Sequence, residues 1–234
     1  MADGIAFDDW EIRLDWRETV APAPVGGDTI GVNPSSTAVI LVGFQNDNFA
    51  SNGVLRGAYE DSAGVETVLQ RTVEFLRRIV HTNLTIICTP IVLDAGYRAL
   101  ASPIGILSTI RESGAFREGT PGAETVPEFV EFGDRITYVR GKVGFNAFSN
   151  TALEGELATR GIKDVLIAGV ISSLCIDSTG RAAYERGYDV TMLSDCTGGR
   201  TDTEHRFYCE QVFPLYGTVK RSDEVLAELS GVSA

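Results

Sequence analysis

The sequence predicts a three-layer α/β/α fold around a mainly parallel, doubly wound sheet. Short apolar runs alternate with amphipathic stretches along most of the 234 residues. A strand buried on both faces appears as a continuous apolar run, whereas a covering helix has an apolar position every three to four residues. This alternation is typical of a parallel sheet with helices on both faces, and such sheets place their sites at the carboxyl ends of the strands.

The first strand is predicted at residues 37–43, where Thr-Ala-Val-Ile-Leu-Val-Gly is almost wholly apolar. Residues 64–80 follow with a helical apolar period. Further strands are predicted at 84–88, 135–139, 164–168 and 189–193, and further helices at 151–159, 174–186 and 203–213. Gly161 and Gly187 follow the last turns of two of these helices, where a left-handed cap is favoured.

Two segments depart from the alternation. Residues 1–35 form a predicted N-terminal arm, in which apolar and charged residues alternate before a Pro- and Gly-rich break. Such an arm packs either on its own domain or on a neighbouring subunit. Residues 90–126 are interrupted by several prolines and glycines around a short helix predicted at 104–113. They form either a binding loop or lid, or a loose surface insertion.

The charge of the chain disfavours two classes of partner. Its 20 basic and 32 acidic residues give a formal net charge of −12. That charge repels a nucleic-acid backbone and an anionic bilayer, so we expect neither partner. The chain opens without a secretory signal, and no apolar run approaches about 18 residues. We therefore expect a soluble, cytoplasmic protein.

The cysteines and histidines give no metal-binding pattern. The chain has four cysteines, Cys88, Cys175, Cys196 and Cys209, and two histidines, His81 and His205. None of the cysteines forms a CxxC pair, and the histidines are not at metal-ligand spacing. We expect a reducing compartment, no metal and no cofactor.

Cys175 is the strongest candidate for chemistry. The apolar strand at 164–168 leads through a short turn into a helix whose first turn contains Cys175. Free backbone amides and the helix dipole favour an anion there, and hence the nucleophilic thiolate. The same amides can stabilise the oxyanion that forms when a thiolate attacks a carbonyl. Taken alone, however, a lone cysteine at this place is more often a small core residue.

Three blocks of sequence favour the catalytic interpretation. The first runs from Asp164 through Ser-Ser-Leu-Cys175 to Arg-Gly-Tyr-Asp-Val at 186–190. The second is Val-Arg-Gly-Lys-Val-Gly-Phe-Asn-Ala-Phe at 139–148, and the third is Val-Ile-Leu-Val-Gly-Phe-Gln-Asn-Asp at 39–47. In order and spacing these blocks resemble the isochorismatase-like cysteine hydrolases, which include nicotinamidases and N-carbamoylsarcosine amidase. The resemblance covers about residues 37–220 and implies a hydrolase domain at 36–234.

The resemblance implies a catalytic set of aspartate, lysine and cysteine. In this family the aspartate takes the thiol proton and later returns it, and the lysine stabilises the ionised pair. Cys175 and Lys142 match two of these positions, whereas the aspartate falls on Gly43, which has no side chain to move a proton. The family pattern also implies an oxyanion hole from the backbone amides of Ile171 and Cys175, and a cis peptide between Val170 and Ile171.

The implied reaction is hydrolysis of a non-peptide C–N bond in a small amide or ureido compound through a Cys175 thioester. The resemblance also implies a homodimer or homotetramer. A stretch that supplies metal ligands in some members has no histidine here. The residues expected to line the substrate pocket are Gln45, Asp47, Phe49, Arg98, Phe145 and Asn146. Arg98 has the guanidinium geometry that suits a substrate carboxylate.

Gly43 leaves several interpretations open. A hydrolase could take its proton acceptor from Asp47, from a water or from the substrate, although Asp47 also fits a bracing role in its own turn. The glycine could be a substitution introduced to trap a substrate. The protein could instead be a non-catalytic binder or regulatory subunit that keeps the pocket. Vinyl-ether cleavage by an isochorismatase proper is disfavoured, because that chemistry needs a proton donor where Gly43 offers none.

Overall fold

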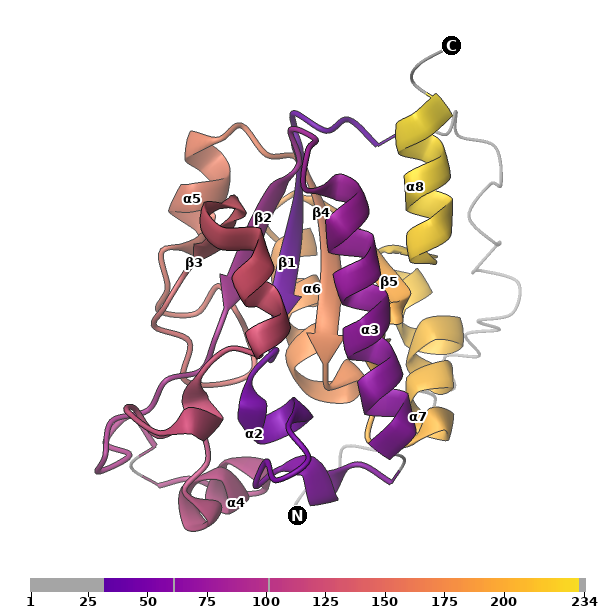
Figure 1. The fold of residues 1–234 in the computed structure, drawn as a ribbon. Helices are drawn as coiled ribbons and strands as arrows, with labels where there is room; N and C mark the ends of the chain where they lie inside the picture. The colour runs from indigo at the N-terminus through magenta and orange to yellow at the C-terminus, as the bar shows by residue number, and fades with distance from the viewer. Residues whose placement is uncertain (1–31, 61, 101, 232–234) are drawn as a thin grey trace, which may run out of the picture. The chain divides into compact units, whose positions relative to one another are not determined.

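The computed structural model of the protein describes residues 32–60, 62–100 and 102–231. Within them, six parallel strands form one sheet in the order β3-β2-β1-β4-β5-β6 (Figure 1). The predicted α/β class is therefore confirmed, with an all-parallel rather than a mainly parallel sheet. The predicted arm lies outside the described residues except for residues 32–35.

All five strands predicted from apolar runs are present. The strands are β1 Thr37–Val42, β2 Thr85–Thr89, β3 Ile136–Tyr138, β4 Asp164–Val170, β5 Asp189–Gly198 and β6 Thr218–Lys220. β1 lies at the centre of the sheet and is buried along its whole length. β6 was not predicted, because its three residues form an edge strand without an apolar run.

Helices lie at all five predicted segments, two of which are divided. The α-helices are α2 Asn46–Phe49, α3 Ser62–Ile79, α4 Ile106–Ser113, α5 Leu153–Thr159, α6 Asp177–Tyr184, α7 Asp202–Phe207 and α8 Ser222–Gly231. Of these, α2 and α8 were not predicted. The helix predicted at 174–186 is divided into a π-helical turn, Ser172–Ile176, and α6. The helix predicted at 203–213 is divided into α7 and a second π-helical turn, Tyr208–Val212. Periodicity alone did not reveal these widened turns, because apolar spacing changes little over five residues.

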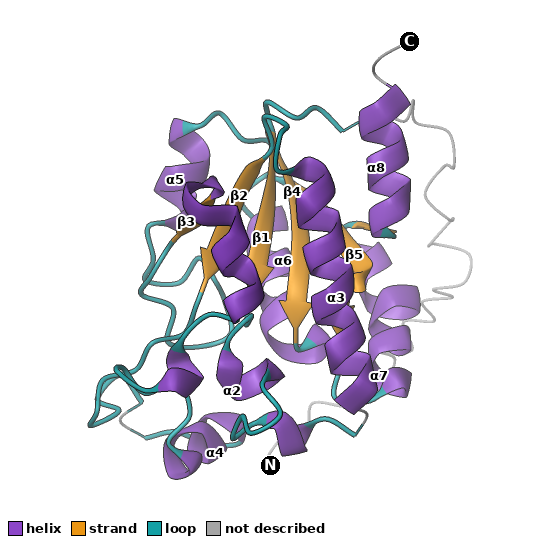
Figure 2. Cartoon of the chain, viewed as in Figure 1, coloured by secondary structure: helices purple, strands orange, loops and turns teal. Residues whose placement is uncertain are grey.

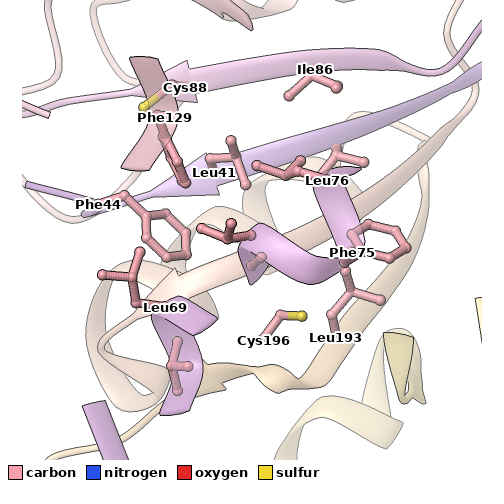
Figure 3. Close-up of a cluster of buried hydrophobic side chains, with 14 of the residues drawn as sticks. Leu41, Phe44, Leu69, Phe75, Leu76, Ile86, Cys88, Phe129, Leu193 and Cys196 are labelled. Carbon is pink, nitrogen blue, oxygen red and sulfur yellow. The ribbon is translucent and has the colours of Figure 1, made fainter. Parts of the chain in front are cut away.

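Two apolar layers hold the helices on the sheet. Val39 and Leu41 of β1 face a layer that includes α3 and α8, whereas Ala38, Ile40 and Val42 face one that includes α5 and α6. Figure 2 shows the sheet between these helices, and Figure 3 shows the α3 side, where Leu41 and other labelled side chains pack together. The strand alternation thus fixes which helices cover which face.

The carboxyl ends of the four strands β1 to β4 meet at one edge of this sheet, toward the lower part of Figure 1. Gly43 follows β1, Lys142 lies beyond β3, and Cys175 lies beyond β4. Parallel pairing therefore brings three distant segments of sequence to one place. In the part of the chain that the structure describes, no helix combines the length and the apolar character needed to cross a membrane.

Candidate active site

Cys175 lies in the π-helical turn Ser172–Ile176, which joins β4 to α6. The carbonyl of Ile171 accepts hydrogen bonds from the amides of Leu174 and Ile176, at 3.1 and 3.2 Å. The bond from Ile176 spans five residues and gives the turn its width. The thiol is half-buried, and the peptide bond between Val170 and Ile171 is cis, as the family pattern implied.

Lys142 is brought to Cys175 by the chain that follows β3. Its backbone forms a parallel bridge with Ile91, beyond the end of β2, and its side chain is completely buried. Its Nζ donates to Cys175 Sγ at 3.5 Å. Burial lowers the pKa of Lys142, and the neighbouring Cys175 opposes that shift. Among the described residues, no carboxylate pairs with this ammonium group.

A buried hydrogen bond ties the lysine loop to the cysteine helix. The amide of Ala147 donates to Thr179 Oγ1 of α6 at 3.1 Å, and both residues are buried. The two segments therefore cannot move apart without leaving a buried polar group unpaired. This bond helps to maintain the distance between Lys142 and Cys175.

The backbone at Gly43 leaves no room for a side chain. Its φ angle is +77°, a conformation that glycine adopts more readily than other residues. A Cβ placed there would lie 2.8 Å from the Val170 carbonyl oxygen and 3.5 Å from Asn48 Nδ2. An aspartate at this position would need the backbone to shift.

Asn48 and Tyr59 continue the wall of the site beside Gly43. Asn48 Nδ2 donates to the Gly43 carbonyl at 2.8 Å, and the Tyr59 hydroxyl donates to Asn48 Oδ1 at 3.1 Å. Burial raises the pKa of Tyr59 well above its ordinary value, and the charge of Cys175 raises it further. Tyr59 is therefore a protonated donor at neutral pH.

Gly43 and Cys175 border a common cavity of about 40 Å³, which has room for a few water molecules. The residues around it are Gly43, Asn48, Leu55, Ala58, Tyr59, Ile91, Ile106, Leu107, Ile110, Phe116, Phe145, Val170, Ile171, Leu174 and Cys175. None of these has a carboxylate or a basic side chain. α4 and Phe116 belong to the irregular segment 90–126, so that segment forms part of the cavity wall.

Gln45 and Asp47 anchor that segment rather than facing the cavity. The buried Gln45 amide donates to the carbonyls of Ile91 and Ala123, each at 2.7 Å, and accepts from the Ile91 amide. The Asp47 carboxylate accepts from the Phe116 amide at 2.6 Å and is almost fully buried. Asp47 thus braces a distant loop, and it is absent from the cavity wall.

The other expected pocket residues lie in different surroundings. Phe145 lines the cavity, whereas Phe49 stacks on Phe44 in the hydrophobic core. Asn146 accepts from the amide of Phe148 at 2.8 Å and so shapes its own turn. Arg98 is exposed and pairs with Asp94 at 3.4 Å, away from the cavity wall.

α7 holds the cysteine turn through two side chains. His205 Nδ1 lies 2.9 Å from Ser172 Oγ, and its Nε2 lies 3.0 Å from the Ser194 carbonyl. Because a carbonyl only accepts, Nε2 carries the proton and Nδ1 accepts from Ser172. Glu204 accepts from Ser173 Oγ at 2.5 Å. Burial lowers the pKa of His205, which favours this neutral form.

The remaining cysteines and carboxylates show no second reactive centre in the described part of the chain. Burial raises the pKa of Cys88 and of Cys196 to about 12 and that of Cys209, which lies beside His205, to about 11, so all three stay protonated thiols at neutral pH. Over the described ranges, no three histidine, cysteine, aspartate or glutamate side chains come together as a metal-ligand group.

The isochorismatase domain family matches residues 37–224, which include all three sequence blocks and the cavity. The chain belongs to the isochorismatase family. It is 26% identical over 243 residues to the ureidoacrylate amidohydrolase RutB of Variovorax paradoxus (strain S110), a match that covers 95% of this chain and 92% of that one.

Two further members extend the comparison. The uncharacterized isochorismatase family protein YwoC of Bacillus subtilis (strain 168) is 32% identical over 108 residues, covering 46% of this chain. That match spans only about half, 56%, of the relative's length. The crystal structure of a cysteine hydrolase from Pseudomonas syringae pv. phaseolicola 1448A shares the fold, with a TM-score of 0.71 and 20% identity over 86% of this chain and 95% of that one.

Several residues around the cavity and the cysteine turn were not expected from sequence. Tyr59 lies in an irregular stretch before α3, and nothing in the local pattern indicates that it lines the same cavity as Cys175. The Ser-Ser pair before Leu-Cys175 and the Glu-His pair in α7 are visible in the sequence, but only the structure shows that they are bonded. Asn48 is unusual in its local sequence, but nothing in the sequence indicates that its side chain binds the Gly43 carbonyl.

Proposed function

We propose that this chain is a cysteine-dependent amidohydrolase that cleaves the C–N bond of a small amide or ureido compound. The main observation behind the proposal is the 3.5 Å contact between the buried Lys142 amino group and Cys175 beside the cavity. The amidohydrolase relative RutB supports the reaction class. In this proposal Gly43 occupies the position of the family's aspartate.

The proposed reaction has two halves. The Cys175 thiolate attacks the substrate carbonyl, and the amides of Ile171 and Cys175 stabilise the oxyanion. The amine leaves as the thioester forms, and a water molecule then hydrolyses the thioester. Lys142 supplies the positive charge that holds the thiolate.

The cavity favours a neutral substrate with a small acyl group. Its wall is almost entirely aliphatic or aromatic, and none of the residues that line it has a basic side chain to meet a carboxylate. An ionised carboxylate in such surroundings would lose its hydration without compensation. Arg98, the residue expected to bind a carboxylate, is exposed and pairs with Asp94. We therefore propose neutral amides or ureido compounds rather than ureido acids.

The thioester itself provides the test. The protein is mixed with a neutral amide, or with an activated ester that carries the same acyl group. The mixture is quenched in acid, and the mass of the intact protein is measured by mass spectrometry. We expect an added acyl mass on Cys175 that hydroxylamine removes, and no addition to Cys175→Ala. An acyl group found on another residue, or none at all with an activated ester, would contradict the mechanism.

A non-catalytic binder is the second candidate, and the conformation of Gly43 favours it. The φ of +77° and the 2.8 Å approach of a Cβ to the Val170 carbonyl indicate a backbone built without a carboxylate at this position. Such a protein would bind a small amide and leave it intact. Isothermal calorimetry together with product analysis distinguishes the two candidates, because a binder gives heat of binding and no released amine.

A further inference from the structure

Amide hydrolysis by a cysteine needs a group that carries a proton. The thiol must lose a proton before it attacks, and the leaving amine must gain one, because an amide anion is too poor a leaving group. Gly43 has no side chain to do this. Among the described residues, two titratable side chains interact with the thiol at the cavity, Lys142 from beyond β3 and Tyr59 from the stretch before α3.

Tyr59 and Asp47 are poor candidates for the carrier. The Tyr59 hydroxyl already donates to Asn48 Oδ1, and burial in an apolar wall holds its proton in place. The Asp47 carboxylate accepts from the Phe116 amide and does not line the cavity. Neither group can both take a proton from Cys175 and return it to a leaving amine.

Lys142 meets both requirements. Its Nζ lies 3.5 Å from Sγ, and this is its one hydrogen-bonded side-chain partner among the described residues. Burial without a carboxylate makes the neutral amine accessible, which is the form that can accept a proton. A nitrogen bonded to the carbon that Cys175 attacks would come within reach of Nζ, because that carbon is bonded to Sγ.

We infer that Lys142 is the catalytic base and acid of this site, exchanging its proton with Cys175, the leaving amine and the attacking water. Neutral Nζ takes the proton from Sγ, and the thiolate electron pair forms the C–S bond. The tetrahedral intermediate expels the amine, which takes the proton from the Lys142 ammonium. A water molecule then attacks the thioester while neutral Nζ takes one of its protons. Nζ gives this proton to Sγ when the C–S bond breaks.

This inference rests on the proposed function. An ester and an amide that carry the same acyl group separate the role of Lys142 from the proposed function itself. A p-nitrophenyl ester releases a stable anion that needs no proton, whereas an amide does not. Lys142→Arg keeps a cation beside the thiolate but is too weak an acid to exchange protons. For this variant we expect amide hydrolysis to slow by about 10²- to 10⁴-fold and the ester burst to slow less, because the ester needs Lys142 for the thiol proton but not for the leaving group. Lys163→Arg, on an exposed lysine, is the matched control and should change neither rate.

A measurement on the unmodified protein guards against misfolding of the variants. The chain has three lysines, Lys142, Lys163 and Lys220, so ε-¹³C-labelled lysine gives few NMR signals, and Lys142→Met assigns one of them. We expect the Lys142 signal to titrate below the ordinary lysine range, and to change when iodoacetamide alkylates Cys175.

The outcomes are distinct. Amide hydrolysis by Lys142→Arg at nearly the original rate would overturn the inference, as would a Lys142 signal that stays protonated throughout the lysine range. If the unmodified protein gives the ester burst but hydrolyses no amide, the proposed function fails. In that case the NMR titration still decides whether Lys142 exchanges a proton with Cys175.

Discussion

The backbone at Gly43 excludes a side chain at the position where the resemblance implies an aspartate. By itself, a φ of +77° could be adopted by a few residue types other than glycine, at some cost in free energy. The 2.8 Å distance from a Cβ to the Val170 carbonyl adds a steric overlap with backbone, which a side-chain rotation cannot relieve. Asn48 and Tyr59 complete the wall on that side.

A pair of glycine substitutions measures this exclusion. Gly161 also has a positive φ, of 65°, but a Cβ added there would meet nothing within 4 Å. We expect Gly161→Ala to lower the free energy of unfolding by about 1 kcal/mol and Gly43→Ala to lower it by about 2–4 kcal/mol. Urea unfolding at equilibrium gives both values. Equal losses in the two variants would show that Gly43 is not sterically confined.

Gly43→Asp extends the same comparison to activity. The variant should lose stability as Gly43→Ala does, because the Cβ overlap is the same. A Gly43→Asp protein that is as stable as the original and hydrolyses amides much faster would instead identify the chain as a disabled form of the ordinary catalytic set. Turnover measured beside the urea unfolding curves separates these two results.

At the level of single residues, sequence predicts the contact between Cys175 and Lys142 better than its surroundings. Cys175 and Lys142 occupy sequence blocks whose order and spacing are recognisable. Tyr59 reaches the site only through the tertiary fold, so no local pattern marks it. Arg98 has suitable chemistry for a carboxylate, but Asp94, four residues earlier, pairs with it at the surface.

Among the elements, α7 supports the cysteine turn through two side chains. His205 accepts from Ser172 while it donates to the Ser194 carbonyl, and Glu204 accepts from Ser173. A protonated His205 would no longer accept from Ser172, because both ring nitrogens would be donors. Protonation of His205 would therefore reverse this hydrogen bond, with the Ser172 hydroxyl as the acceptor.

The lowered pKa of His205 makes stability depend on pH in a predictable direction. Burial lowers this pKa, whereas the Ser194 carbonyl and the carboxylates of Asp202 and Glu204 oppose the shift. The unfolded chain binds the histidine proton more readily than the folded chain, so stability rises with pH through this window. The contribution is complete above the ordinary histidine pKa and is lost as pH falls through the lowered one.

His205→Gln tests this dependence, because glutamine can both donate and accept without titrating. We expect the melting temperature of the unmodified protein to fall more steeply than that of His205→Gln as pH drops below about 6.5. His81→Gln, at the other and exposed histidine, is the matched control and should follow the unmodified protein. Parallel curves for all three proteins would show that His205 carries no such linkage.

The elements also show where periodicity is informative. Apolar runs located β1 to β5, and the left-handed glycines at 161 and 187, with φ of 65° and 82°, ended their helices as predicted. β5 continues to Gly198, past the apolar run, because its last residues keep pairing beside β4 after a register shift. Such an extension depends on the neighbouring strand and cannot be seen in the run itself.

On the scale of the whole molecule, net charge and the cavity both disfavour anionic substrates. The chain carries a formal net charge of −12, and the residues of the cavity wall include no cation. Long-range repulsion slows the approach of an anion, and salt screens this repulsion. The apolar cavity wall makes binding of an anion unfavourable after it has entered, and salt does not screen that effect. Salt therefore separates the two effects.

Propanamide has a methyl group where malonamate has a carboxylate, so the two amides allow a direct comparison. We expect kcat/KM to favour the neutral amide by at least about 100-fold, and added salt to narrow but not remove the difference. Leu107→Arg places a cation on the half-buried cavity wall and should shift the preference toward malonamate. A preference for malonamate in the unmodified protein would contradict the proposed substrate class.

The central claim is that Cys175 and Lys142 hydrolyse an amide without a carboxylate at position 43. The most direct test follows amine release from small neutral amides by the unmodified protein and by Cys175→Ala, at equal concentration and with folding checked by circular dichroism. We expect turnover by the unmodified protein and none by Cys175→Ala. Equal release by both proteins, or binding of the amides without release by either, would contradict the claim.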